Sequence, residues 1–169
     1  MGANNKAYPY NWITYHVSDT HRRIQPRSLL NLFSVAATKQ IEAQDFESPF
    51  HLKPRYMELA TKEVADRRVQ DIKEEYPELD KVFDQLKDYH QQFPIEETKL
   101  EDALEKIISR NSSPVSVSEI KDKLVDIGVL YKYRAKTKEQ RYHIPDLYLF
   151  GMGLRRRGPG AHKALFGKK

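Results

Sequence analysis

The sequence predicts a mainly α-helical protein, in which a helical bundle is followed by a winged helix-turn-helix with a small β-hairpin and a basic C-terminal tail. Three observations lead to this prediction. Apolar residues recur at helical spacing between residues 26 and 127. After Gly128 the pattern changes to two short aromatic and β-branched segments joined by a polar connector. The last 19 residues contain six basic and no acidic side chains.

The same observations divide the chain into four regions. We expect an extended lead-in over residues 1–25, because its aromatic and histidine side chains follow no sustained period. A helical, lid-like bundle is expected over 26–93, a winged-helix domain over 94–150, and the basic tail over 151–169.

Proline marks the start of the first two predicted helices, since its fixed φ suits a first helical turn. The first helix is expected over 26–43, the second over 54–76 and a third over about 78–92. The first helix should turn the following side chains inward: Leu29, Leu30, Phe33, Ala36, Ala37 and Ile41. A loop that contains Ser48-Pro49 separates it from the second helix.

Two capping-box patterns predict the next two helix starts. Thr98 with Glu101 opens a helix that should end near Asn111, and Ser116 with Glu119 opens a helix over 117–127. Gly128 then suits the left-handed conformation that ends many helices.

Two strands are predicted after Gly128, over 129–133 and 141–144, with the basic connector 134–140 as a wing between them. Pro145 keeps the following apolar segment out of a central strand.

Composition excludes several classes of protein. A chain of 169 residues is one ordinary domain or two small ones. Its lack of cysteine removes disulfide frameworks, cysteine-type zinc sites and thiol catalysis, and favours a cytoplasmic location. No apolar run approaches the ~20 residues of a membrane span, and no signal peptide is visible, so we expect a soluble protein with no membrane contact.

No catalytic or metal site can be assigned from the sequence. The seven glycines are placed so that no P-loop can be written. His16, Asp19 and His21 match no metal-ligand spacing, and no hydrolytic grouping stands out, so we predict no catalytic residue, no metal ligand and no cofactor for this chain alone.

Charge points to the C-terminal part of the chain as the place for any nucleic-acid contact. Residues 55–110 carry ten basic and fifteen acidic side chains, and are unsuited to a polyanion. Phosphate contacts are predicted from wing and tail, at Arg134, Lys136, Lys138, Arg141, Arg155, Arg156 and Arg157. Helix 117–127 exposes nearly balanced charges, which argues against sequence-specific recognition of bases by this helix. The alternative to nucleic-acid binding by wing and tail is that this surface contacts a protein or is only solvated.

Two short stretches resemble a known family. The run from Asp19 to Phe33, with Pro26-Arg27 at a helix start, is similar to the opening of the helical lid in bacterial P-loop ATPases of the AAA/STAND type. The run from Tyr142 to Tyr148, followed by Gly151-x-Gly153-Leu154-Arg155-Arg156, resembles the C-terminal end of such proteins.

The resemblance implies a non-catalytic lid and winged-helix module, whose P-loop core or other protein partner lies elsewhere, with a possible oligomer and a role in phage defence. Arg27 would then be the lid arginine that faces the nucleotide's terminal phosphates, with Arg23 and Arg22 beside it. ATP and Mg²⁺ would bind only if such a core completed the site.

Two other hypotheses stay open. A free-standing winged-helix regulator would bind DNA through wing and tail with steep salt dependence. A small enzyme ranks last, because no site can be named for it.

Overall fold

The computed structural model describes residues 9–46, 52–112 and 114–157. Within these ranges the chain is mainly helical with a few short strands, which confirms the predicted α-rich class. The helices are α1 (Pro9–Val17), α2 (Pro26–Glu42), α3 (Pro54–Glu75), α4 (Asp80–Tyr89), α5 (Glu97–Asn111), α6 (Val117–Asp126) and α7 (Asp146–Leu149), with a 3-10 turn η1 (Pro77–Leu79) before α4. Among the described residues, no helix is both long and apolar enough to cross a membrane.

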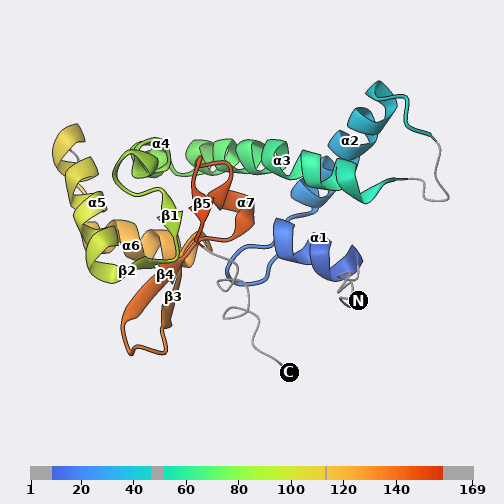
Figure 1. The fold of residues 1–169 in the computed structure, drawn as a ribbon. Coiled ribbons are helices and arrows are strands. Elements are labelled where there is room, and N and C mark those ends of the chain that lie inside the picture. Colours follow the sequence, from blue (N-terminus) through green and yellow to red (C-terminus); the bar gives the residue numbers. More distant parts are fainter. Residues whose placement is uncertain (1–8, 47–51, 113, 158–169) are drawn as a thin grey trace.

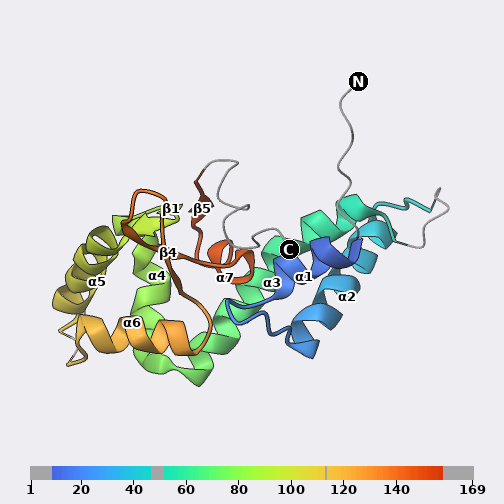
Figure 2. The same cartoon turned by 90° about the horizontal axis from the view of Figure 1, so that it is seen from below.

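Helix α3 joins the two ends of the molecule (Figures 1 and 2). Helix α2 packs along α3 at one end, with α1 beside them, and α4, α5 and α6 gather at the other end. Helix α7 lies between and contacts both α3 and α1. The buried apolar side chains of both ends belong to one continuous cluster.

The described residues form five short strands: β1 (Gln92–Phe93), β2 (Ile95–Glu96), β3 (Tyr131–Arg134), β4 (Gln140–His143) and β5 (Arg155–Arg156). Strands β3 and β4 form the predicted antiparallel hairpin, displaced by one or two residues from the expected ranges. Strand β2 extends it to the order β2-β4-β3, and β1 pairs in parallel with β5. Strands of two residues are too short to show a period, so the sequence could not predict β1, β2 or β5.

One predicted capping box is confirmed and the other is wrong. Ser116 and Glu119 cap each other's backbone at the start of α6. Helix α5, however, begins at Glu97 with no side-chain cap, because β2 leads directly into it. Gly128 has a φ of +83°, the left-handed conformation that was predicted.

The prediction of an extended lead-in over 1–25 is wrong for residues 9–17, which form α1. The Trp12 and His16 rings stack four residues apart at 4.2 Å, and Val17 is buried. A nine-residue helix is too short to be stable alone, so packing rather than period sustains it. Residues 1–8 lie outside the described ranges, as does Ser48-Pro49.

The predicted inward face of α2 is wrong in part. The helix extends over Pro26–Glu42, close to the expected range, and buries Ala36 as predicted, but the residues that accompany Ala36 against α3 are Leu32 and Val35. Leu30 and Ile41, which were expected inside, are 68% and 61% exposed. Apolar residues occupy two sides of this helix, and periodicity alone does not tell which side is covered.

Glu97 of α5 connects the β3–β4 hairpin to helices α5 and α6 through hydrogen bonds. Its carboxylate accepts hydrogen bonds from Lys132 of β3 at 3.0 Å, from Lys121 of α6 at 3.1 Å and from Tyr142 of β4 at 3.1 Å. The Lys132 contact contributes most to holding the pKa of Glu97 below its ordinary value.

We therefore expect Glu97→Gln to lower the free energy of unfolding by about 1–2 kcal/mol at about pH 7. A folded-state pKa below the unfolded one stabilises the fold above the unfolded pKa, and this contribution is lost as pH falls through the folded value. Urea unfolding of both proteins should thus show a smaller difference at about pH 3 than at about pH 7. Glu105→Gln, an exposed carboxylate on the same helix, is the control. A penalty that does not change with pH would contradict this account.

Candidate functional site

The segment 18–25 connects α1 to α2 and contains Arg22 and Arg23; it is here called the arginine loop. Asp19 organises it, because its carboxylate accepts hydrogen bonds from the backbone N–H groups of His21 and Arg23 at 2.8 and 2.9 Å. The same carboxylate pairs with Nε of Arg23 at 2.7 Å. Arg22 has a φ of +61°, and it lines a different pocket from Arg23.

The arginine loop is fixed to the end of α6, about 100 residues later in the chain. The Thr20 N–H donates to the Gly128 carbonyl at 3.0 Å, and the His21 ring bonds the Val125 carbonyl at 2.9 Å. A Cβ at Gly128 would lie 2.7 Å from Asp19 Oδ2, so glycine permits this close approach. A displacement of the loop would therefore be transmitted to α6.

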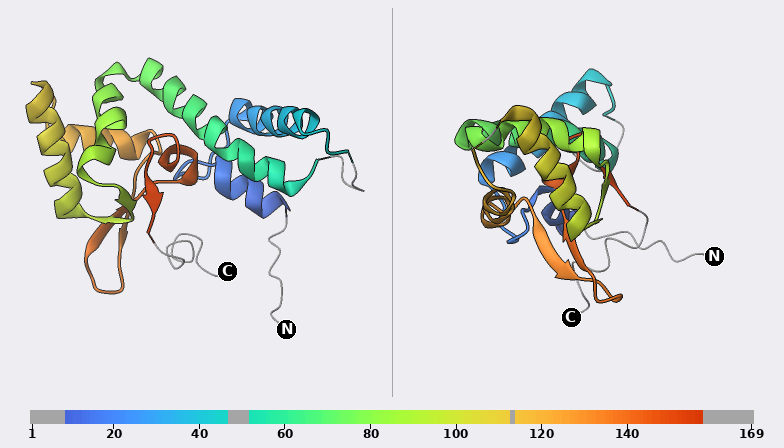
Figure 3. Two further views of the ribbon diagram at one scale, coloured as in Figure 1. Left: turned by 45° about the horizontal axis from the view of Figure 1, so that its top comes forward. Right: turned by 90° about the vertical axis from the view of Figure 1, so that its left-hand side faces the viewer.

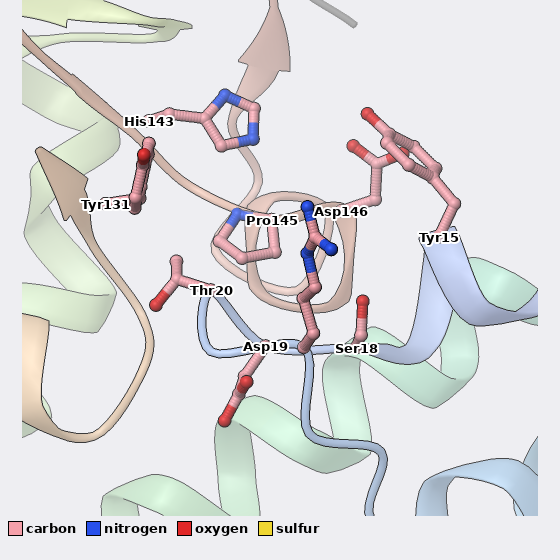
Figure 4. A pocket seen from close by; sticks show the side chains of 9 residues that line it. Tyr15, Ser18, Asp19, Thr20, Tyr131, His143, Pro145 and Asp146 are labelled. Atoms are coloured by element: carbon pink, nitrogen blue, oxygen red, sulfur yellow. The ribbon is translucent and has the colours of Figure 1, made fainter. Parts of the chain in front are cut away.

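A small cavity of about 110 Å³ lies beside the arginine loop (Figure 4). Its lining consists of Tyr15, Ser18, Asp19, Thr20, Arg22, Tyr131, His143, Pro145 and Asp146. Burial raises the pKa of the Tyr15 hydroxyl, with a further contribution from the charge of Asp146. The volume is well below the ~300 Å³ of ordinary small-molecule sites. The cavity suits a few water molecules or one small group.

Behind this cavity lies a buried charge network that the sequence analysis missed. Asp146 is 4% exposed and pairs with Arg156, and its second oxygen lies 3.5 Å from the His16 ring. Arg156 also donates to the Ile144 carbonyl at 2.8 Å and contacts the ring of His143. The signal in the sequence was an aspartate inside the apolar run 144–150, where a charge requires a buried partner.

The predicted lid arginines lie on the surface. Arg23 and Arg27 have side chains 60% and 75% exposed. Arg23 is held by Asp19, and Nη1 of Arg27 lies 3.4 Å from Asp71 of α3. The structure thus keeps both guanidinium groups accessible, with Arg23 held more tightly than Arg27.

The predicted wing cations differ in their exposure and in their ion pairing. Arg134, Lys136 and Lys138 are exposed around the turn between β3 and β4, and Nε of Arg134 bonds the Lys138 carbonyl. Arg141 is paired with Glu139 at 3.0 Å and is only 27% exposed. Figure 3 shows this hairpin extending from the body of the molecule.

The tail does not behave as one basic segment. Arg155 and Arg157 are exposed, but the side chain of Arg156 is 10% exposed and joins the buried network of Asp146. Its predicted role as a nucleic-acid contact is therefore wrong, because strand alternation turns it inward between its two neighbours. The region that was predicted as a basic tail contains strand β5 at residues 155–156. Residues 158–169 lie outside the described ranges.

Helix α6 presents an acidic face to solvent. Glu119, Asp122 and Asp126 are exposed. Lys121 forms ion pairs with Glu97 and Glu101. The ammonium group of Lys123 lies 3.7 Å from the Glu78 carboxylate and over the Tyr76 ring. Both lysines of this helix thus have carboxylate partners on neighbouring elements.

No group of three or more potential metal ligands occurs among the described residues. Searches with protein-family models, curated proteins and solved structures gave no match to this chain. The site must therefore be interpreted from its own geometry, which offers accessible guanidinium groups on a loop fixed to a distant helix.

Proposed function

We propose that this chain is a non-catalytic lid and winged-helix module, with regulatory and interaction roles, of a STAND-like P-loop ATPase whose nucleotide core lies elsewhere. The single observation that carries the proposal is the attachment of the arginine loop to α6. An exposed arginine, Arg23, on a loop that is fixed to a separate helical unit can sense phosphates and transmit the result.

The C-terminal half supports the winged-helix part of the proposal. Its elements follow the order α4, β1, β2, α5, α6, β3, β4, and the three-stranded sheet has the order β2-β4-β3. A helix-turn-helix pair leads into a hairpin whose turn carries exposed cations, as expected of a wing.

The arginine loop supports the lid part. Asp19 restrains Arg23 through two hydrogen bonds, one from its backbone N–H and one from Nε, so little side-chain freedom is lost when an anion binds. Phosphate oxygens would compete with Asp19 for the guanidinium. Release of Asp19 would loosen the contact at Gly128, and the movement would reach α6.

The first test is a two-dimensional NMR titration of the intact chain with Mg·ATP up to about 10 mM, with tripolyphosphate and adenosine as separate arms. We expect weak binding, with shifts at residues 18–27 that extend to 125–128 for ATP and tripolyphosphate but not for adenosine. Arg23→Gln should abolish these shifts, and Arg110→Gln, an exposed arginine on α5, should not. Shifts confined to the wing, or none at all, would reject the lid proposal.

Nonspecific DNA binding is the second candidate, and the exposed cations of the wing favour it. The acidic surface of α6 opposes insertion into a groove, because phosphates would repel Glu119, Asp122 and Asp126. Contacts would then be limited to the wing and the exposed tail arginines.

Fluorescence anisotropy with a random duplex of about 25 base pairs, at low and physiological salt, tests this candidate. If the wing binds DNA, K136E/K138E should weaken binding at least tenfold and reduce its salt dependence. Truncation should stop after Arg157, since a shorter chain would lose the buried Arg156. Absence of binding at low salt would eliminate the DNA-binding candidate.

A further inference from the structure

Helix α2 is apolar on two opposite sides, and only one of them is covered. Leu32, Val35 and Ala36 are at most 7% exposed and pack against α3. On the other side Leu30 is 68%, Phe33 41% and Ile41 61% exposed. Single exposed apolar residues are ordinary, but several in one row are not.

The three exposed residues form one stripe with the half-buried Ala37. At 3.6 residues per turn, Leu30, Phe33, Ala37 and Ile41 lie within about 80° of one another and opposite the face that contacts α3. The stripe is about 16 Å long, since it spans eleven steps of 1.5 Å. Ser34 and Thr38 border it and are uncharged, and the lysine of this segment, Lys39, pairs with Glu63 of α3.

The position of α2 leaves this stripe open. The helix lies at the outer edge of the molecule with α3 along one side (Figures 1 and 3). Among the described residues, no element covers the opposite side, as the exposed fractions show. The stripe is therefore open to a second molecule.

We propose that the stripe is the interface of a homodimer, in which α2 of one chain packs antiparallel against α2 of a second copy. The stripe is complementary to itself. A two-fold axis close to residues 35 and 36 places the bulky Phe33 near the small Ala37 of the second copy, and Leu30 near its Ile41. A two-fold axis makes every such contact twice, as an isologous interface requires.

The charges at the ends of the stripe favour the antiparallel direction. Arg27 is exposed near its N-terminal end and Glu42 near its C-terminal end. Antiparallel packing brings these unlike ends together and also opposes the two helix dipoles, whereas parallel packing would align like charges.

Three large apolar side chains from each copy make a small interface, so the dimer should depend on concentration. Sedimentation equilibrium of the full 169-residue chain from about 10 µM to about 1 mM tests this expectation. We expect the apparent mass to rise from 19.8 kDa toward twice that value. A constant monomer mass over this range would overturn the proposal.

Matched variants locate the interface. L30S/F33S should remain monomeric over the same range, with far-UV circular dichroism used to verify that it is folded. Both side chains are exposed, so the fold does not depend on them. Leu59→Ser removes an equally exposed leucine on α3 and should dimerise like the parent chain. Equal loss of the dimer in both variants would overturn the assignment to α2.

Spin labels test the antiparallel direction. The chain contains no cysteine, so S34C and E42C each introduce a single nitroxide site. Residue 34 lies close to the two-fold axis and residue 42 far from it, so the distance between labels should be shorter for S34C. Equal distances at the two positions would indicate parallel helices and overturn the proposed arrangement. None of these outcomes depends on nucleotide binding.

Discussion

Replacement of Gly151 by alanine is expected to destabilise the folded chain by about 3 kcal/mol or more, at the upper end of overpacking effects. A Cβ at this position would lie 2.3 Å from the backbone oxygen of Ala65 and 2.7 Å from Cγ2 of Val69. The oxygen belongs to the middle of the 22-residue helix α3, which cannot move away locally. The turn after α7 would have to separate from α3.

Thermal and urea unfolding of G151A measure this effect. A loss of about 3 kcal/mol corresponds to a decrease in Tm of roughly 6–12 °C for a chain of this size. Gly153→Ala is the control two residues away, because its nearest neighbour is the flexible Lys87 side chain at 3.4 Å. Its φ of +68° alone should cost about 1–2 kcal/mol. Equal losses in both variants would show that the approach to α3 at Gly151 costs no more than the backbone strain at Gly153.

Replacement of Asp146 by alanine is expected to cost about 3–5 kcal/mol, because it leaves the buried guanidinium of Arg156 without its anion. Asp146 and Arg156 have side chains 3% and 10% exposed, so water cannot replace the lost partner. The same change removes the acidic neighbour of His16 in α1. Helix α1 should therefore lose amide protection first in hydrogen exchange.

A double-mutant cycle separates the ion pair from general packing loss. D146A/R156A should be less destabilised than the sum of the two single variants, since removal of both charges leaves none unpaired. Asp66→Ala breaks the exposed pair with Lys62 and should change stability by at most about 1 kcal/mol. Additive losses at Asp146 and Arg156 would show that the two charges do not stabilise each other.

Much of the local structure could be predicted from short-range signals. Proline placed the starts of α2 and α3, a capping box placed α6, and Gly128 marked its end. The change to aromatic and β-branched residues placed the β3–β4 hairpin. These features depend on residues within one or two turns of each other, so the sequence contains their cause directly.

The candidate site could be predicted only in part. Arg23 and Arg27 came from a resemblance, and the structure shows that both are accessible. The contact between Thr20 and Gly128 could not be found, because it joins residues that are distant in sequence. For the same reason Arg156 was assigned to the surface, although Asp146 binds it inside the protein.

The sequence by itself determined where α2, α3, α6 and the hairpin form, since caps, prolines and periodic apolar residues act locally. Only the tertiary structure decided which side of α2 is covered, that residues 9–17 are helical, and that Arg156 is buried. Each of these depends on the neighbour that a segment meets. Helix α2 is apolar on two sides, and either side could pack against a neighbour. Because α3 lies against one of them, Leu32 and Val35 are buried and Leu30 and Ile41 stay exposed.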